Sequence, residues 1–147
     1  MKRDDTGVAK NFLILSDKAA RRYRRELKAI HAAARAARES LEEAQTRSGE
    51  DVVRLAREAA LQGYERLLVL GGDGTLHLAV QGLMQAPEPR PLFVPLPFGT
   101  GNDFYRGIAE GQTFPLQKIF GTWREFTLSL GSVEGEGMER RYFLNSL

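Results

Sequence analysis

The chain has 147 residues, of which 42% are apolar and 27% are charged, with a formal net charge of +2 and no cysteine. This length suits one hydrophobic core with room for the beginning of a second. The absence of cysteine excludes a disulfide scaffold, a thiol nucleophile and cysteine-ligated metal centres, and the small net charge gives no support to nucleic acid as a partner. The apolar runs are far shorter than the ~20 residues of a membrane-spanning helix and no signal peptide is predicted, so we expect a cytoplasmic protein.

The first predicted element is a buried strand at the short apolar run of residues 11–15. Ser16 and Asp17 then supply a helix start, and residues 18–37 are mainly good helix formers, so we predict a helix that could extend to Glu43. No strand is predicted between this helix and the next one. The first half of the helix is basic, which indicates either a solvated face or an anion site. Its cations are Lys18, Arg21, Arg22, Arg24, Arg25 and Lys28.

The following elements alternate between helix and strand. Ser48 or Gly49 starts a second helix with apolar residues at helical spacing, and Gly63 ends it. The continuous apolar run at 67–70 is typical of a parallel strand covered on both faces. A third helix around residues 76–83 precedes a strand at 92–96, where Pro95 indicates an edge position. This alternation predicts an α/β fold with a parallel sheet.

The last part of the chain has a different pattern. Residues 125–133 alternate enough to form a strand, 134–137 read as a turn, and 141–144 begin another strand. Successive strands replace the earlier alternation, so we predict a domain boundary near residue 125.

Two glycine-rich turns carry the candidate chemistry. The first, at residues 71–75, lies between a predicted buried strand and a predicted helix. Glycines permit positive φ and close approach of a ligand, and a helix start offers unpaired N–H groups. A polyphosphate is therefore the ligand that suits this turn. Asp73 would repel phosphate unless a magnesium ion, or a proton to be removed, stands between them. The alternative is a tight turn in which Asp73 merely caps the helix.

The second turn, at residues 99–103, follows the strand at 92–96 and adds a hydroxyl, an amide and a carboxylate. Because the carboxyl ends of parallel strands lie at one edge of a sheet, both turns are expected to converge on one crevice. Neither a Rossmann fingerprint nor a P-loop is present.

The two turns together resemble the catalytic domain of diacylglycerol kinases and related bacterial lipid kinases, as do Gly82-Leu83 and the Arg-Tyr-Phe-Leu-Asn segment at 141–145. The resemblance implies a three-layer parallel-sheet domain at residues 1–125 and, at 126–147, the start of a truncated β-rich domain that would need about 150 more residues. It also implies ATP- and Mg²⁺-dependent transfer of the γ-phosphoryl group to a lipid hydroxyl, such as that of diacylglycerol. The isolated segment is expected to be inactive.

The resemblance also assigns roles to residues. Asp73 would be the catalytic residue, beside the metal ion or the reacting hydroxyl. The nucleotide contacts would be Thr46, Gly71, Gly72, Gly74, Thr75, Gly99, Thr100, Gly101 and Asn102, and Asp103 would orient its loop or contact substrate. Contact of the basic helix with an anionic membrane, and pairing of open strand edges between two copies, are further expectations.

The sequence departs from the family pattern at three places. Ser16 and its neighbours replace an Asn-Pro, Leu78 replaces a glutamate, and Ser129 replaces an aspartate of a metal-linked network. These departures leave open a nucleotide-binding module without catalysis. The first turn alone also resembles that of NAD kinase, which is a more remote alternative.

Overall fold

The parallel sheet predicted from the sequence is present in the computed structural model, which describes residues 7–96, 119–120 and 129–143. It consists of β1 (Lys10–Ser16), β2 (Ser40–Thr46), β3 (Arg66–Leu70) and β4 (Leu92–Leu96). The strand order is β2-β1-β3-β4 and every pairing is parallel, so β4 lies at an edge of the described sheet, as Pro95 indicated.

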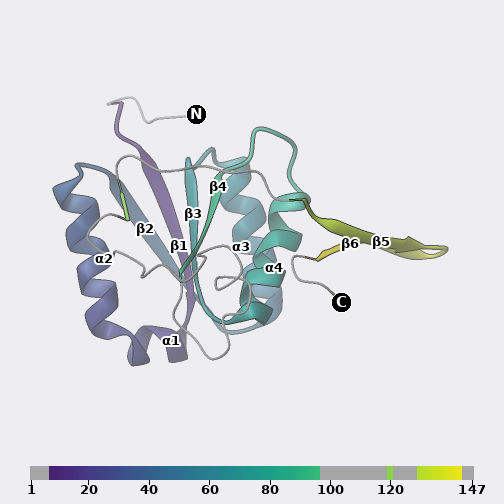
Figure 1. Ribbon diagram of the computed structural model, residues 1–147, viewed down its shortest axis with the longest axis horizontal. Helices are drawn as coiled ribbons and strands as arrows, with labels where there is room; N and C mark the ends of the chain where they lie inside the picture. Colours follow the sequence, from purple (N-terminus) through teal and green to yellow (C-terminus); the bar gives the residue numbers. More distant parts are fainter. Residues whose placement is uncertain (1–6, 97–118, 121–128, 144–147) are drawn as a thin grey trace.

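Helices cover both faces of the sheet (Figure 1). α1 (Asp17–Arg22) and α2 (Arg24–Ala36) lie on one face, and α3 (Gly49–Leu61) and α4 (Asp73–Met84) lie on the other. Successive residues of a strand point to opposite faces, so Ile14 joins the core under α3 and α4, whereas Leu13 joins the core under α1 and α2. The fold is therefore a three-layer α/β domain.

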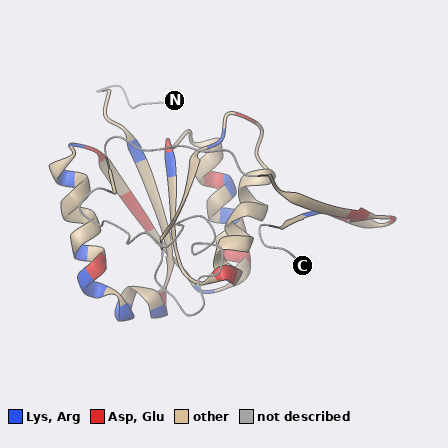
Figure 2. Cartoon of the chain, in the orientation of Figure 1, with Lys and Arg blue, Asp and Glu red and all other residues tan. Residues whose placement is uncertain are grey.

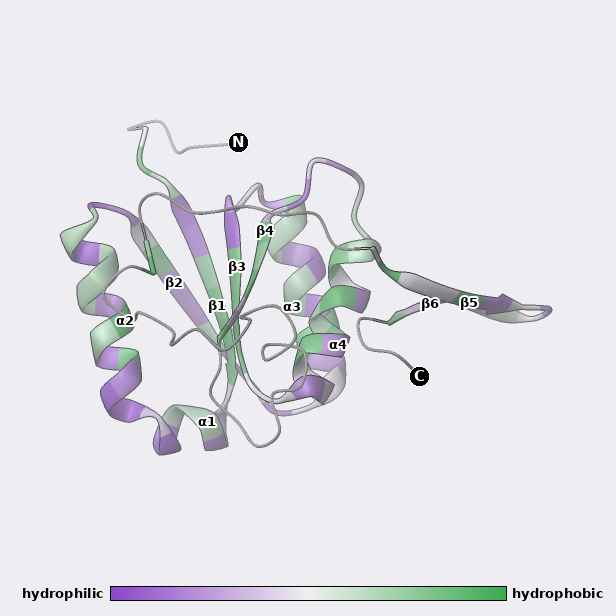
Figure 3. Cartoon of the chain, viewed as in Figure 1, coloured by the Kyte–Doolittle hydropathy of each residue, from purple (hydrophilic) through white to green (hydrophobic). Residues whose placement is uncertain are grey.

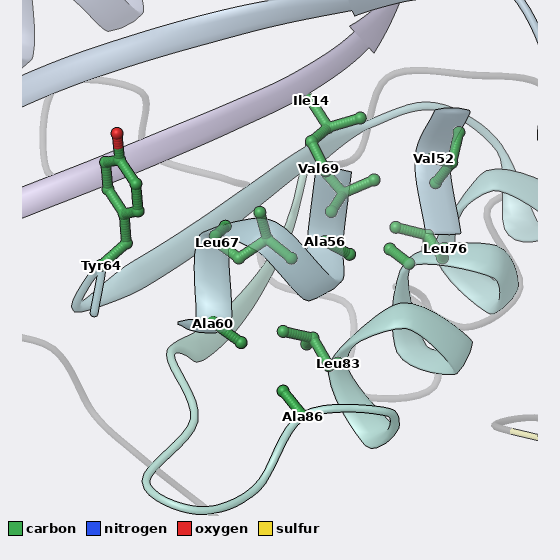
Figure 4. Packing of buried hydrophobic residues seen from close by; sticks show 12 residues of the cluster. Ile14, Val52, Ala56, Ala60, Tyr64, Leu67, Val69, Leu76, Leu83 and Ala86 are labelled. Carbon is green, nitrogen blue, oxygen red and sulfur yellow. The ribbon is translucent and has the colours of Figure 1, made fainter. Parts of the chain in front are cut away.

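The hydrophobic residues gather where these layers meet (Figure 3). Every residue of β3 is buried, as expected for a central strand covered on both faces. In the core between this sheet and α3 and α4, side chains of Leu67 and Val69 face Ala56 and Leu83 (Figure 4).

The predicted long first helix is wrong in its second half. The helix is broken at Tyr23, and α2 ends at Ala36, after which Arg38 takes a positive φ of 56°. The chain then forms β2, which pairs with β1 along all seven residues. The reason is that β1 needs hydrogen-bond partners on the side away from β3, and a partly exposed edge strand supplies them without any apolar run in its sequence.

The last turn of α4 approaches the first half of α3 closely. A Cβ atom at Gly82 would lie 2.2 Å from the carbonyl oxygen of Val53 and 2.8 Å from the Cβ of Ala56. Only glycine fits between these two backbones, so α4 is held against α3 along its length.

An antiparallel hairpin follows the sheet domain and projects beside α4 (Figure 1). It consists of β5 (Gly131–Gly135) and β6 (Met138–Phe143). Two successive strands are present as predicted, but their bounds differ: residues 129–130 lie outside the first strand, and the turn is confined to Glu136 and Gly137 instead of 134–137, with a φ of +74° at Gly137. The predicted boundary near residue 125 falls outside the described residues.

Candidate functional site

A cleft of about 370 Å³ opens at the carboxyl edge of the sheet. Ser16 at the end of β1 lines it, together with residues 46–49 between β2 and α3. Gly74, Thr75 and Leu78 of α4 form another wall. The first turns of two helices and the end of a strand therefore meet at one site, which is where parallel α/β sheets commonly bind ligands.

The first glycine turn uses the small size of glycine rather than its conformational freedom. None of the three glycines in this turn has a positive φ, and Gly72 has a φ of −81°. A Cβ atom at Gly71 would lie 2.7 Å from the Cβ of Thr75, so glycine leaves the space that the threonine side chain fills. A Cβ atom at Gly74 would meet nothing within 4 Å, so its backbone faces open space at the cleft.

The three helices that begin at this edge differ in how their first N–H groups are satisfied. The Ser16 hydroxyl accepts a hydrogen bond from the Ala19 N–H at 3.0 Å at the start of α1. The Ser48 hydroxyl accepts one from the Asp51 N–H at 3.2 Å at the start of α3. The N-cap of α4 is Gly72, which offers no side-chain oxygen. The start of α4 therefore presents backbone donors that no N-cap side chain occupies, together with the positive end of a helix dipole, and these favour an anion.

Asp73 is the first residue of α4 and is partly buried. Within the parts of the chain that the structure describes, no three acidic or histidine side chains gather into a ready-made metal site. Mg²⁺, however, is usually held by one or two carboxylates together with phosphate oxygens and water. A single carboxylate at the head of a phosphate-binding helix fits a magnesium ion that arrives with a nucleotide.

The β2–α3 connection forms the wall opposite α4. Thr46 is 5% exposed and its hydroxyl donates to the Leu15 carbonyl at 3.4 Å, which ties the end of β2 to β1. The next N–H, that of Arg47, donates to an Asp51 carboxylate oxygen at 2.9 Å. This bond, followed by the Arg54 guanidinium, holds the pKa of Asp51 below its usual value.

The structure brings some of the predicted site residues together and leaves others untested. Thr46, Gly74 and Thr75 line the cleft, and residues 71–73 directly precede Gly74 in the chain. The second turn lies outside the described residues, so its predicted contacts stay predictions. These are Gly99, Thr100, Gly101, Asn102 and Asp103.

Five of the described residues that line the cleft were not predicted as ligand contacts: Arg47, Ser48, Gly49, Val52 and Leu78. Arg47 is exposed and is the cation among the described residues that line the cleft. Its position directly after Thr46 was the available signal. Leu78 lies near Gly49, with its Cδ1 atom 3.0 Å from where a Cβ of that glycine would be. The lost family glutamate is thus replaced by an apolar wall.

Comparisons with known proteins agree with this geometry. The sequence model of the family described as "Diacylglycerol kinase catalytic domain" matches residues 10–126. The chain therefore belongs to the diacylglycerol kinase catalytic domain family.

Individual relatives carry related names. The chain is 40% identical over 100 residues to "Diacylglycerol kinase" of Bacillus subtilis, which covers 65% of this chain and 30% of that protein. It is 52% identical over 64 residues to "Probable lipid kinase YegS-like" of Chromohalobacter salexigens, covering 43% of this chain and 21% of that protein. The chain thus spans less than a third of the length of these two curated relatives.

A solved structure shares the fold. It is described as "A putative diacylglycerol kinase from Bacillus anthracis str. Sterne", and it matches with a TM-score of 0.60 and 32% identity over 68% of this chain and 34% of that one. In addition, none of the described helices has the length and apolar character needed to cross a bilayer.

Proposed function

We propose that this chain is the nucleotide-binding part of an ATP-dependent lipid kinase, which transfers the γ-phosphoryl group to a lipid hydroxyl such as that of diacylglycerol. The observation that carries the proposal is the uncapped start of α4 at the cleft, next to two helices that are capped by their own serines. Membership of the diacylglycerol kinase catalytic domain family supports the reaction type.

In this proposal the glycine turn holds the phosphates of ATP. The N–H groups at the start of α4 donate to phosphate oxygens, and Gly74 leaves room for them to approach. Arg47 places a positive charge at the cleft, and Thr46 contributes its hydroxyl oxygen as an acceptor. Phosphoryl transfer demands chiefly positioning and stabilisation of charge, which such a cradle provides.

Asp73 is the proposed catalytic carboxylate. It would hold Mg²⁺ against the phosphate oxygens, and a bound Mg²⁺ would neutralise charge on the transferred group. During transfer the lipid oxygen forms a bond to the γ-phosphorus as the bond from that phosphorus to the β,γ-bridging oxygen breaks and ADP leaves, and the lipid hydroxyl gives its proton to the Asp73 carboxylate or to water. Asp73 lies at the helix start where a carboxylate could stay close to this proton.

A second candidate is a nucleotide-binding module without phosphoryl transfer. The apolar side chain of Leu78 in the cleft wall favours it, because the carboxylate of the family pattern is missing there. The two candidates agree on ATP binding and differ on turnover.

Calorimetry on residues 1–147 and a radiolabelled-ATP assay on the full-length gene product separate them. We expect Mg²⁺-dependent ATP binding and transfer to diacylglycerol. Sphingosine, monoacylglycerol and NAD are tested as alternative acceptors. Gly74→Ala would place a methyl group at the phosphates and weaken ATP binding about tenfold, without unfolding the chain. Gly135→Ala in the hairpin is the matched control.

Each outcome of these measurements has a distinct meaning. Binding without transfer to any acceptor would establish the second candidate. Absence of ATP binding, or equal affinity in wild type and Gly74→Ala, would contradict the cradle at α4. If Asp73→Asn has the same ATP affinity and the same rate of phosphoryl transfer as wild type, the proposed role of that carboxylate is wrong.

The basic first half of the α1–α2 segment is proposed to contact anionic lipid headgroups. Its six cations are exposed, and no ion pair joins any of them to the described residues (Figure 2). We call this set the basic face; its members are Lys18, Arg21, Arg22, Arg24, Arg25 and Lys28. The basic face begins two residues after Ser16, which lines the cleft, so contact of this face with an anionic membrane would bring the cleft to the membrane surface. Sedimentation with anionic vesicles tests it.

A further inference from the structure

Gln81 is a buried polar side chain on α4 whose amide binds a single residue of the hairpin. Its side chain is buried, with 5% of the residue exposed. Its Nε2 donates to the carbonyl oxygen of Tyr142, and its Oε1 accepts from the Tyr142 N–H at 2.9 Å. We call this pair of hydrogen bonds the Gln81–Tyr142 bridge.

The bridge reproduces the hydrogen bonds of a neighbouring strand. In an antiparallel ladder, one residue exchanges both its N–H and its C=O with the residue opposite. β6 has β5 on one side, and on its other side the amide of Gln81 satisfies both backbone groups of Tyr142. An apolar side chain of the same size could not do this, because it has neither donor nor acceptor.

Each residue of the bridge is adjacent in the chain to a residue that makes a close packing contact. Gln81 precedes Gly82, the residue at which α4 touches the backbone of α3. Tyr142 precedes Phe143, whose ring lies over Gly131 so closely that a Cβ there would be 2.0 Å from it. The base of the hairpin is thus closed beside the bridge, and neither end can shift alone.

The bridge also connects the hairpin to the candidate phosphate site through one helix. Gln81 is eight residues after Asp73 on α4, which places them about 12 Å apart along the helix axis. Between them, α4 buries Leu76, Ala79 and Val80. Because a helix packed in this way is rigid, it fixes the position of the β6 contact relative to the glycine turn at its other end.

We infer that Gln81 is a positioning residue, which sets the orientation of the β5–β6 hairpin relative to the phosphate-binding start of α4. The inference rests on the proposed kinase function, and it adds that the hairpin helps to orient the lipid acceptor toward the γ-phosphoryl group. Gln81 acts through the Tyr142 backbone and does not touch the nucleotide. Its loss therefore lowers phosphoryl transfer while ATP affinity is retained.

The test compares Gln81→Leu with Gln85→Leu, the same change at an exposed position one turn later on α4. In residues 1–147, NMR hydrogen exchange reports the Tyr142 amide directly, and calorimetry reports ATP affinity. In the full-length gene product, kinetics separate kcat from the KM for ATP. Gln81→Leu should speed exchange of the Tyr142 amide at least about tenfold. It should lower kcat about ten- to a hundredfold, because small misplacements of reacting groups are costly. ATP affinity should stay within about twofold, and Gln85→Leu should change nothing.

Gln81→Glu supplies a readout that a general loss of packing would not give. A charged carboxylate accepts from the Tyr142 N–H but cannot donate to its carbonyl, whereas the protonated acid can do both. Protection of the Tyr142 amide, measured relative to wild type at each pH, should therefore fall at neutral pH and return as the pH is lowered.

The possible failures are distinguishable. If the Tyr142 amide exchanges equally in wild type and Gln81→Leu, the bridge does not form and the inference is wrong. If Gln81→Leu lowers ATP affinity in parallel with kcat, Gln81 merely stabilises the fold and is no positioning residue. If the wild-type protein transfers no phosphoryl group, the proposed function fails, and Tyr142 exchange alone then supports or overturns the bridge.

Discussion

The two edges of the sheet handle polar groups in opposite ways. At the amino edge, Arg66 pairs with Glu39, both almost completely buried, and donates to the Asn11 side chain at 3.3 Å. Asn11 in turn donates to the Ser40 carbonyl at 3.0 Å, so the network joins β1, β2 and β3. At the carboxyl edge, the start of α4 has no side-chain cap and the basic face is exposed. The amino edge pairs its buried charges within the protein, whereas at the carboxyl edge α4 begins without a side-chain cap and the basic face is open to solvent.

This difference indicates where stability and function are separated. A buried ion pair stabilises the fold only while both partners remain, and its groups are not accessible to a ligand. Groups at the carboxyl edge contribute little to folding and are available for binding. Substitutions at the two edges should therefore differ in kind as well as in size.

The largest effect is expected for Arg66→Met at the amino edge. The substitution leaves Glu39 buried without this partner, which should cost about 3–5 kcal/mol of unfolding free energy. Urea denaturation measures the loss, and the ATP affinity of the protein that remains folded should be unchanged.

The double variant Arg66→Met/Glu39→Leu is the control, because it removes both charges and should regain much of the lost stability. A loss below about 1 kcal/mol in Arg66→Met would mean that the pair is not buried as described. A loss of ATP affinity in the folded protein would break the separation between the two edges.

A smaller effect is expected for Ser48→Ala, which removes the cap of α3 at the cleft. The Asp51 N–H loses its acceptor, so we expect a loss of about 1 kcal/mol by urea denaturation. Ser132→Ala on the exposed hairpin is the control, with a change of less than about 0.5 kcal/mol. Equal stability of Ser48→Ala and Ser132→Ala would show that the Ser48 cap contributes nothing measurable to the stability of α3.

The pH dependence of this cap follows from Asp51. Its pKa is lower in the folded protein than in the unfolded chain, first because of the Arg47 N–H and then because of Arg54. The stabilisation by the carboxylate is therefore present above the unfolded value of about 3.9 and is lost as the pH falls through the folded value. The stability difference between wild type and Asp51→Asn should accordingly shrink below about pH 4.

The smallest effect on stability is expected at the basic face. Reversing Lys18, Arg21 and Arg25 to glutamate should change unfolding free energy by no more than about 0.5 kcal/mol per site. Sedimentation with anionic vesicles should nevertheless weaken about fivefold for each cation lost, and less so at high salt. Arg57→Glu, on the exposed side of α3, is the control. If sedimentation with vesicles does not depend on anionic lipid or on salt, contact of the basic face with anionic headgroups is wrong.

Much of the fold could be predicted from local patterns. The apolar runs of β1, β3 and β4 and the helical spacing in α3 and α4 show burial directly, and these elements are confirmed. The pattern of β2 does not, because an edge strand with Glu42, Glu43 and Gln45 on its exposed positions has no apolar run. Alanine-rich sequence before it resembled a continuing helix, and only pairing with β1 decided otherwise.

The candidate site was predictable to a similar extent. A glycine turn between a buried strand and a helix identified residues 71–75, and the family pattern added Thr46. Arg47, Ser48 and Leu78 were not predicted as cleft residues, because they become neighbours of Gly74 only when β2 and β3 end at the same edge. Gln81 gave no signal at all, since its partner is 61 residues away.

By itself, the sequence determined the alternation of helices and strands, the family, and the position of one glycine-rich turn after a buried strand. Those properties depend on residues close together in the chain, whose hydrophobicity and backbone preferences act locally. The tertiary structure alone decided that β2 pairs with β1, that α4 begins at the cleft beside two helices capped by serines, and that Gln81 joins the hairpin to α4. Each of these depends on which distant backbone group satisfies a hydrogen bond, and that is settled only when the layers pack together.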